Sequence, residues 1–132
     1  MIKAFNEYIK EGLNKIPDEN KNGDCYIQAY NYFMKNHTKN KNLRLCHGLV
    51  TGQGKIKGIV YNHAWCEDIN KGVVFDMTMP SFFQNVETKI YYLMGKINTD
   101  TVFKYDFNEV IDKASEFKTY GPWEEVLINN EY

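Results

Sequence analysis

The chain has 132 residues, of which 43% are hydrophobic and 25% charged, and its formal net charge is −1. This length fits one domain spanning 1–132, and the near-neutral charge argues against the cationic surfaces by which nucleic-acid-binding and polybasic membrane-binding modules act. No apolar run approaches the roughly 20 residues that span a bilayer, no secretory signal is evident, and three cysteines, an odd number, favour reduced thiols. We therefore expect a soluble cytoplasmic domain.

The first part of the chain is predicted to be helical. Apolar residues at three- and four-residue spacing predict an amphipathic helix over residues 2–16, which Pro17 ends, and the polar stretch 18–23 is predicted to be a loop. Asp24 can cap a second helix that runs from Cys25 to about Asn36. The inward stripe of this second helix is expected to be Ala29, Tyr30, Phe33 and Met34.

The hydrophobic pattern then changes to that of strands. Strands are predicted over residues 43–50, 56–69 and 73–78, with a tight loop at 51–54 and a turn at 70–72. These three strands form an antiparallel meander.

The last third of the chain gives a mixed pattern. Residues 89–97 are predicted as a strand, although their pattern is ambiguous. Asp106, with Glu109 three residues later, resembles a capping box that begins a last helix ending near Phe117, and residues 121–123 are predicted to turn and pack Trp123 against the body. Helices, then a meander, then a helix indicate an α+β fold with a helix packed on an antiparallel sheet.

The cysteines differ in their predicted settings. Cys25 falls in the first turn of a helix, where unpaired amides and the helix dipole favour a thiolate and can stabilise an oxyanion beside the sulfur. Cys46 and Cys66 fall within apolar strands, where a buried thiol behaves as a small hydrophobic side chain. Cys25 is therefore the candidate nucleophile, although an isolated cysteine at a helix start is more often structural.

His63 and Asp76 are predicted to approach each other in the sheet. Side chains alternate along a strand, so His63 shares a face with Tyr61, Trp65 and Glu67. If the next turn holds an even number of residues, Asp76 lies on that face, opposite His63 or one diagonal step away. An aspartate there can fix the tautomer of a histidine that accepts a thiol proton. The alternative is a core histidine and an aspartate that caps the strand end.

Three segments together resemble a known family. They are Gly23-Asp24-Cys25 followed by Ala29, then residues 63–67 (HAWCE), then residues 75–78 (FDMT). They resemble the G-x-C-x-x-x-A, H-x-W-x-E and D-x-T motifs of the transglutaminase-like core of the papain-like cysteine hydrolase superfamily, in the same order, over about residues 23–80. Met77 stands where the family often has proline.

The resemblance implies a function and a set of roles. Cys25 would be the nucleophile, His63 the base and Asp76 the residue that orients the base. The implied reaction is thiol-dependent acyl transfer or hydrolysis of a peptide, isopeptide or amide bond, with a peptide or protein substrate and no cofactor. Asn20, Asn22 and Trp65 are candidates for the oxyanion hole or for substrate binding, because papain-like enzymes usually offer an upstream glutamine and the family's tryptophan walls its site. Trp65 is equally well explained as a core side chain.

Two other classes of protein are alternatives. A zinc site could use Cys46, His47, His63 and Cys66, but neighbours and third neighbours on a strand point to opposite faces, so each pair is poorly placed to share a metal. A non-catalytic binding module on the same fold is the other alternative. Brief alkylation distinguishes a poised thiol from such a module.

Overall fold

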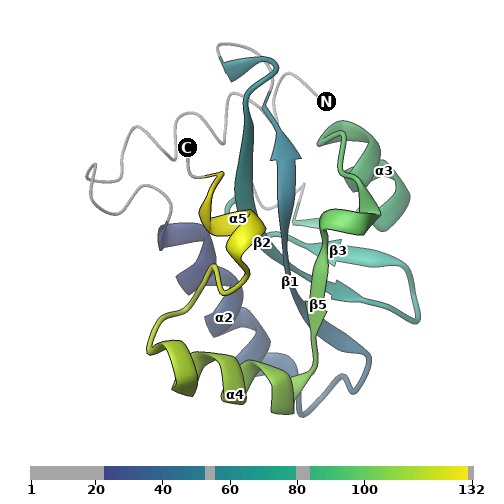
Figure 1. Ribbon diagram of the computed structural model, residues 1–132. Coiled ribbons are helices and arrows are strands. Elements are labelled where there is room, and N and C mark those ends of the chain that lie inside the picture. The colour runs from purple at the N-terminus through teal and green to yellow at the C-terminus, as the bar shows by residue number, and fades with distance from the viewer. Residues whose placement is uncertain (1–22, 53–55, 80–83, 131–132) are drawn as a thin grey trace.

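The computed structural model describes residues 23–52, 56–79 and 84–130 and shows an α+β fold, with helices packed on a five-stranded antiparallel sheet (Figure 1). The strands are β1 (Leu43–Thr51), β2 (Val60–Asp68), β3 (Val73–Phe75), β4 (Asn85–Glu87) and β5 (Phe103–Tyr105). The helices are α2 (Gly23–Asn36), α3 (Thr88–Met94), the 3-10 helix η4 (Thr99–Thr101), α4 (Phe107–Phe117) and α5 (Glu125–Ile128). The strand order is β4-β3-β2-β1-β5, so the predicted meander is present and β5 pairs with the outer edge of β1.

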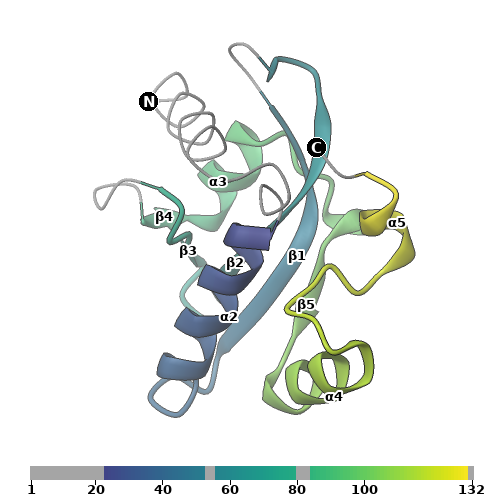
Figure 2. The ribbon, with the colours of Figure 1, turned by 90° about the vertical axis from the view of Figure 1, so that its left-hand side faces the viewer.

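The sheet separates two groups of buried side chains, because successive residues of a strand point to opposite faces. On one face, Leu45 and Cys66 pack with α2 and with Val110 of α4. On the other face, Cys46 and Trp65 pack with α3. Figure 1 shows α2 and α3 on opposite sides of the sheet, and Figure 2, seen from the side of α2, shows that helix in front of the strands.

The helix predicted over 25–36 is confirmed as α2, which begins two residues earlier, at Gly23. Ala29 and Phe33 of the predicted stripe are buried against the sheet, and Tyr30 and Met34 are half-buried beside them. The strand predicted over 43–50 is also confirmed, as β1.

The start of α4 has the predicted capping box. The side chain of Asp106 accepts a hydrogen bond from the Glu109 N–H at 3.0 Å, and the side chain of Glu109 accepts one from the Asp106 N–H at 3.1 Å. The helix ends at Phe117, as predicted, and Trp123 is buried against the body of the protein.

The strand predicted over 56–69 is too long at its beginning, because β2 begins only at Val60. The Ile59 N–H bonds to the Ile56 carbonyl, and Gly58 has a φ of 81°, a left-handed conformation that glycine adopts at little cost. A turn therefore replaces the first part of the predicted strand.

The strand predicted over 73–78 is too long at its end, because β3 ends at Phe75. The carboxylate of Asp76 accepts hydrogen bonds from the backbone N–H of Thr78 at 3.0 Å and from its hydroxyl at 2.6 Å. Such a local bond offers the backbone an alternative to sheet pairing and turns the chain away.

The strand predicted over 89–97 is wrong, because most of this segment belongs to α3. Tyr91 and Met94, three residues apart, are buried, whereas Leu93 is 76% exposed. This spacing is helical, and the succession of apolar residues at 91–93 concealed it.

Several predictions lie outside the described residues: the helix over 2–16, the loop residues 18–22 and the second half of the loop at 51–54. Among the described residues, no helix has the length and apolar character needed to cross a membrane.

Candidate active site

Helix α2 carries Cys25 in its first turn, as predicted. There the backbone N–H groups have no partner within the helix, and the helix dipole favours negative charge. None of the three cysteines forms a disulfide. Cys25 is 9% exposed, while Cys46 and Cys66 are 0% exposed, so Cys25 alone of the three offers any surface to a reagent.

His63 bridges Cys25 and Asp76. The Nε2 of His63 lies 2.9 Å from Oδ2 of Asp76, so the predicted contact between these residues is confirmed. The Cys25 side chain acts on the same imidazole, because its charge and its hydrogen bonding are among the causes that raise the pKa of His63. Because Nε2–H donates to the carboxylate, Nδ1 is the ring nitrogen that remains for the thiol. The imidazole of His63 thus interacts with both the carboxylate of Asp76 and the thiol of Cys25.

The register of β2 and β3 explains the His63–Asp76 contact. Cys66 pairs with Phe75, so continuing the ladder by one residue would set Asp76 beside Trp65. Trp65 and His63 are two residues apart and share a face. Asp76 is therefore one diagonal step from His63, which is one of the two positions predicted.

The Cys25–His63 contact is less expected, because α2 packs on the face of Ala64 and Cys66 and His63 belongs to the other face. In the described part of the chain, β3 pairs only with residues 66–68 of β2. The residues of β2 that precede Cys66, among them His63, have no partner in β3. β3 therefore forms no ladder with His63, the residue on whose pKa Cys25 acts.

The surroundings of His63 favour its protonated form. Burial disfavours the imidazolium, but the negative charges of Asp76 and Cys25 and the hydrogen bonds to both outweigh burial and raise the pKa of His63 to about 10. A charged imidazolium between a carboxylate and a sulfur is the state required by a thiolate–imidazolium pair.

Asp76 is a buried carboxylate whose two oxygens each receive two donors. Oδ1 binds the Thr78 N–H and hydroxyl, and Oδ2 binds His63 and the hydroxyl of Tyr91, the last at 2.6 Å. Burial raises the pKa of Asp76, but the imidazolium of His63 and these hydrogen bonds lower it overall. The sequence pattern does not indicate the role of Tyr91, because it predicts a strand at this position and not the helix that faces the carboxylate.

Trp65 packs behind the imidazole. Its ring lies nearly parallel to that of His63, with centroids 6.1 Å apart, and it is fully buried in the core cluster on the α3 side. The indole N–H donates to Oε2 of Glu67 at 2.8 Å, and the buried Glu67 also pairs with Lys104. The indole N–H is thus engaged with Glu67, and Trp65 both fills the core and backs the imidazole. The other two candidates for this role, Asn20 and Asn22, lie outside the described residues.

The four candidate zinc ligands do not lie together. His47 pairs with Ala64 and its ring lies on the α2 side among Tyr26 and Trp123, whereas Cys46 lies in the cluster on the α3 side. The thiol of Cys66 is bonded to the Ala29 carbonyl at 3.3 Å. In the part of the chain that the structure describes, no group of three or more His, Cys, Asp or Glu side chains could hold a metal ion.

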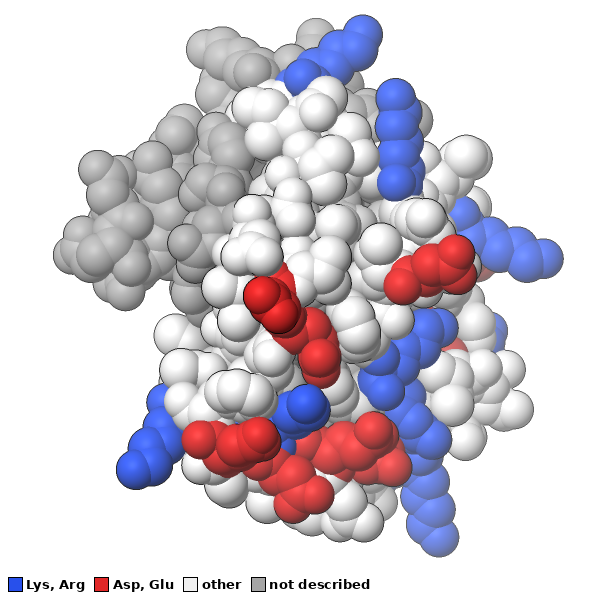
Figure 3. Space-filling model, in the orientation of Figure 1, with Lys and Arg blue, Asp and Glu red and all other residues white. Residues whose placement is uncertain are grey.

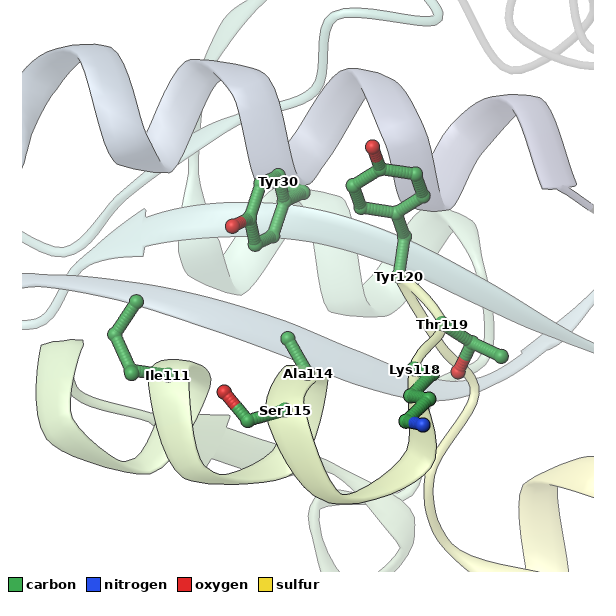
Figure 4. A pocket seen from close by; sticks show the side chains of 7 residues that line it. All are labelled: Tyr30, Ile111, Ala114, Ser115, Lys118, Thr119 and Tyr120. Carbon is green, nitrogen blue, oxygen red and sulfur yellow. The ribbon is translucent and has the colours of Figure 1, made fainter.

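Two surface grooves of about 360 Å³ lie away from Cys25, His63 and Asp76. One lies between α2 and α4, with Tyr30 and Tyr120 on one side and Ala114 and Ser115 on the other (Figure 4). The face shown in Figure 3 carries both acidic and basic side chains and no continuous cationic patch, so it gives no support to a polyanion-binding surface there.

Comparison of this chain with protein-family models, with curated proteins and with solved structures finds no match in any of the three.

Proposed function

We propose that this chain is a thiol-dependent hydrolase or acyltransferase of peptide, isopeptide or amide bonds, with a transglutaminase-like core. Cys25 is the nucleophile, His63 the acid and base, and Asp76 the residue that orients His63. The observation that carries the proposal is the 2.9 Å bond between His63 and Asp76, on an imidazole that also has Cys25 close enough to raise its pKa. The three residues come from a helix start, a strand and the end of the next strand, as the motif resemblance requires.

In the proposed reaction, the Cys25 thiolate attacks the carbonyl carbon and forms a tetrahedral oxyanion. Backbone N–H groups at the start of α2 stabilise the oxyanion. His63 gives its proton to the leaving amine as the C–N bond breaks, which leaves a thioester on Cys25 and a neutral imidazole. His63 then takes a proton from the acceptor, whose oxygen or nitrogen attacks the thioester and releases the thiolate.

The acceptor decides the outcome. Water gives a peptidase or amidase, and an amine gives a transglutaminase. The triad serves both equally, because the choice depends on which acceptor reaches the thioester. Three reduced thiols fit a reducing compartment such as the cytoplasm.

Brief alkylation with iodoacetamide tests the proposal. Cys25 should react well ahead of Cys46 and Cys66, because it is partly exposed and faces an imidazolium, whereas burial raises the pKa of both other thiols well above the usual value. Mass spectrometry of tryptic peptides gives the rate for each cysteine. The matched variant is His63→Gln, which should slow alkylation of Cys25 while leaving the other two thiols unchanged.

A thiol-reactive peptide probe, followed by a set of peptide and isopeptide substrates, then separates an enzyme from a binding module. Labelling and turnover that both disappear in Cys25→Ala support the proposal. Equal alkylation rates at all three cysteines, or turnover that persists in Cys25→Ala, would overturn it.

A further inference from the structure

The residues next to Cys25 and His63 in the sequence are themselves hydrogen-bonded to each other. Tyr26 follows Cys25 in α2, and Asn62 precedes His63 in β2. The hydroxyl of Tyr26 donates to Oδ1 of Asn62 at 2.8 Å, and both side chains are buried. A direct bond therefore joins the first turn of α2 to β2 one residue away from each member of the thiol–imidazole pair.

The C-terminal segment fixes the Asn62 end of this bond. The side-chain amide of Asn62 donates to the Leu127 carbonyl at 2.7 Å, and its backbone N–H donates to the Asn130 carbonyl at 3.0 Å. Both carbonyls lie in or just after α5, which sits beside β1 and β2 (Figure 1). The side-chain amide of Asn62, whose Oδ1 accepts the hydrogen bond from the Tyr26 hydroxyl, is thus held in one orientation.

The ring of Tyr26 is also held in place, by the side chain of His47 and the backbone of Gly121. The imidazole of His47 meets it edge to face, with centroids 4.7 Å apart. The backbone of Gly121 also lies close: a Cβ at that position would stand 2.6 Å from Cδ1 of Tyr26. Tyr26 can therefore not swing away from Asn62 without displacing these neighbours.

We infer that Tyr26 and Asn62 are positioning residues that hold the Cys25 thiol against His63. This inference rests on the proposed function. Cys25 and Tyr26 share one rigid helical turn, and Asn62 and His63 share one strand, so fixing Tyr26 against Asn62 fixes the separation of sulfur and imidazole. A helix lying on one face of the sheet needs such a tie to keep its thiol at a histidine of the other face.

The test is the pH profile of Cys25 alkylation by iodoacetamide in Tyr26→Phe, which removes one oxygen and keeps the ring. Loosening the contact should weaken the thiolate–imidazolium pair, so alkylation near neutral pH should slow by about tenfold and its half-maximal point should move to higher pH. The matched control is Tyr105→Phe, which removes another buried phenol whose hydroxyl donates to a carboxylate, Glu124, at 2.8 Å. Tyr105→Phe should keep the wild-type profile, even if both variants lose similar stability.

A second variant, Asn62→Ser, removes the acceptor from the other side. It should shift the profile in the same direction, and the double variant with Tyr26→Phe should be no slower than the slower single variant, because both changes break the same bond. A folded Tyr26→Phe with the wild-type alkylation profile would overturn the inference. Failure of the proposed function is a different result: wild-type alkylation of Cys25 would then be insensitive to His63→Gln.

Discussion

The hydroxyl of Tyr91 and the imidazole of His63 share one oxygen of Asp76: Oδ2 receives Tyr91 at 2.6 Å and His63 at 2.9 Å. Tyr91 comes from α3, a helix that holds no member of the proposed triad. A buried carboxylate stays ionised only where donors replace the water it has lost. Tyr91 is therefore part of what keeps Asp76 an anion beside His63.

We expect Tyr91→Phe to raise the pKa of Asp76, because one of the hydrogen bonds that lower it is removed. The free energy of unfolding should fall by about 1–3 kcal/mol, the usual cost of losing a hydrogen bond to a charged group. A lowered carboxyl pKa gives stability that is present above the unfolded value of about 3.9 and is lost as pH falls from there to the folded value. In the variant this acid-dependent loss should therefore be smaller and should end at a higher pH. Denaturant unfolding over a range of acidic pH measures it.

Tyr92→Phe is the control for this change. Tyr92 is the next residue of α3, and its hydroxyl bonds to Glu67, not to Asp76. It should leave the acid dependence of Asp76 unchanged. If Tyr91→Phe and Tyr92→Phe shift the acid limb equally, the Tyr91–Asp76 bond has no special part in keeping the carboxylate ionised.

The three cysteines should divide sharply when each is changed to alanine. Cys25→Ala should abolish turnover, because the substitution removes the proposed nucleophile, and it should cost no more stability than the other two changes, because Cys25 lies at the edge of the same core and is 9% exposed. Cys46→Ala and Cys66→Ala should retain turnover and lose about 1–2 kcal/mol of stability, because each thiol is fully buried in the core. Activity assays and denaturant unfolding on the same preparations check both halves of the prediction, and turnover in Cys25→Ala contradicts it.

The parts of the site that follow local rules could be predicted from the sequence. The start of a helix at Cys25 needed only the polar stretch before it and the apolar spacing after it. The His63–Asp76 contact needed only the alternation of a strand and the parity of one turn. Both predictions are independent of how the helices pack.

The remaining parts depend on tertiary packing. Tyr91 reaches Asp76 only because α3 covers that face of the sheet, and the apolar succession at 91–93 gave no clear period. The bond from Tyr26 to Asn62 joins residues 36 positions apart, and its geometry is set by the angle at which α2 crosses β2. The end of β3 at Phe75 has a local cause instead, the turn that the Asp76 side chain makes with Thr78, and it agrees with the alternative in which the aspartate caps the strand end.

Asp76→Asn should separate an orienting role from a structural one. An asparagine has one acceptor where Asp76 has two, so either its amide N–H₂ faces His63 Nε2–H or it faces the donors of Thr78. In both orientations the amide N–H₂ faces donor groups with which it cannot form a hydrogen bond. The imidazolium also loses the negative charge that compensates its own. We expect kcat to fall by at least ~10²-fold with a smaller change in KM, and Cys25 alkylation to slow in parallel.

The contrary result for Asp76→Asn is equally clear. If the melting temperature falls while turnover and Cys25 alkylation keep their wild-type rates, Asp76 serves only to end β3. The Asn62 and Glu67 side chains could not take over the orienting role, because Asn62 is bonded to Tyr26 and Leu127 and Glu67 to Trp65 and Lys104.

The last prediction concerns His47, a fully buried imidazole whose two ring nitrogens have no hydrogen-bond partner in the described structure. The rings of Tyr26, Tyr105 and Trp123 surround it at centroid distances of 4.7, 5.2 and 4.7 Å. Burial, and then the positive charge of His63, lower the pKa of His47 to about 3. The folded protein therefore holds this imidazole neutral where the unfolded chain, with a pKa of about 6.5, binds a proton.

Stability should consequently fall with pH below about 6.5, by about 1.4 kcal/mol per pH unit for this one group. The other groups with shifted pKa values change the unfolding free energy outside a pH range in which only His47 changes it. The raised pKa of His63 costs stability only as pH rises from about 6.5 toward 10, and the lowered pKa values of Asp68 and Asp76 matter only near or below about 4. Between about pH 4.5 and about 6, the slope of the unfolding free energy should therefore disappear in His47→Leu, which cannot take up a proton. Denaturant unfolding of both proteins at several pH values measures the two slopes, and an unchanged slope in His47→Leu would assign the acid sensitivity to another group.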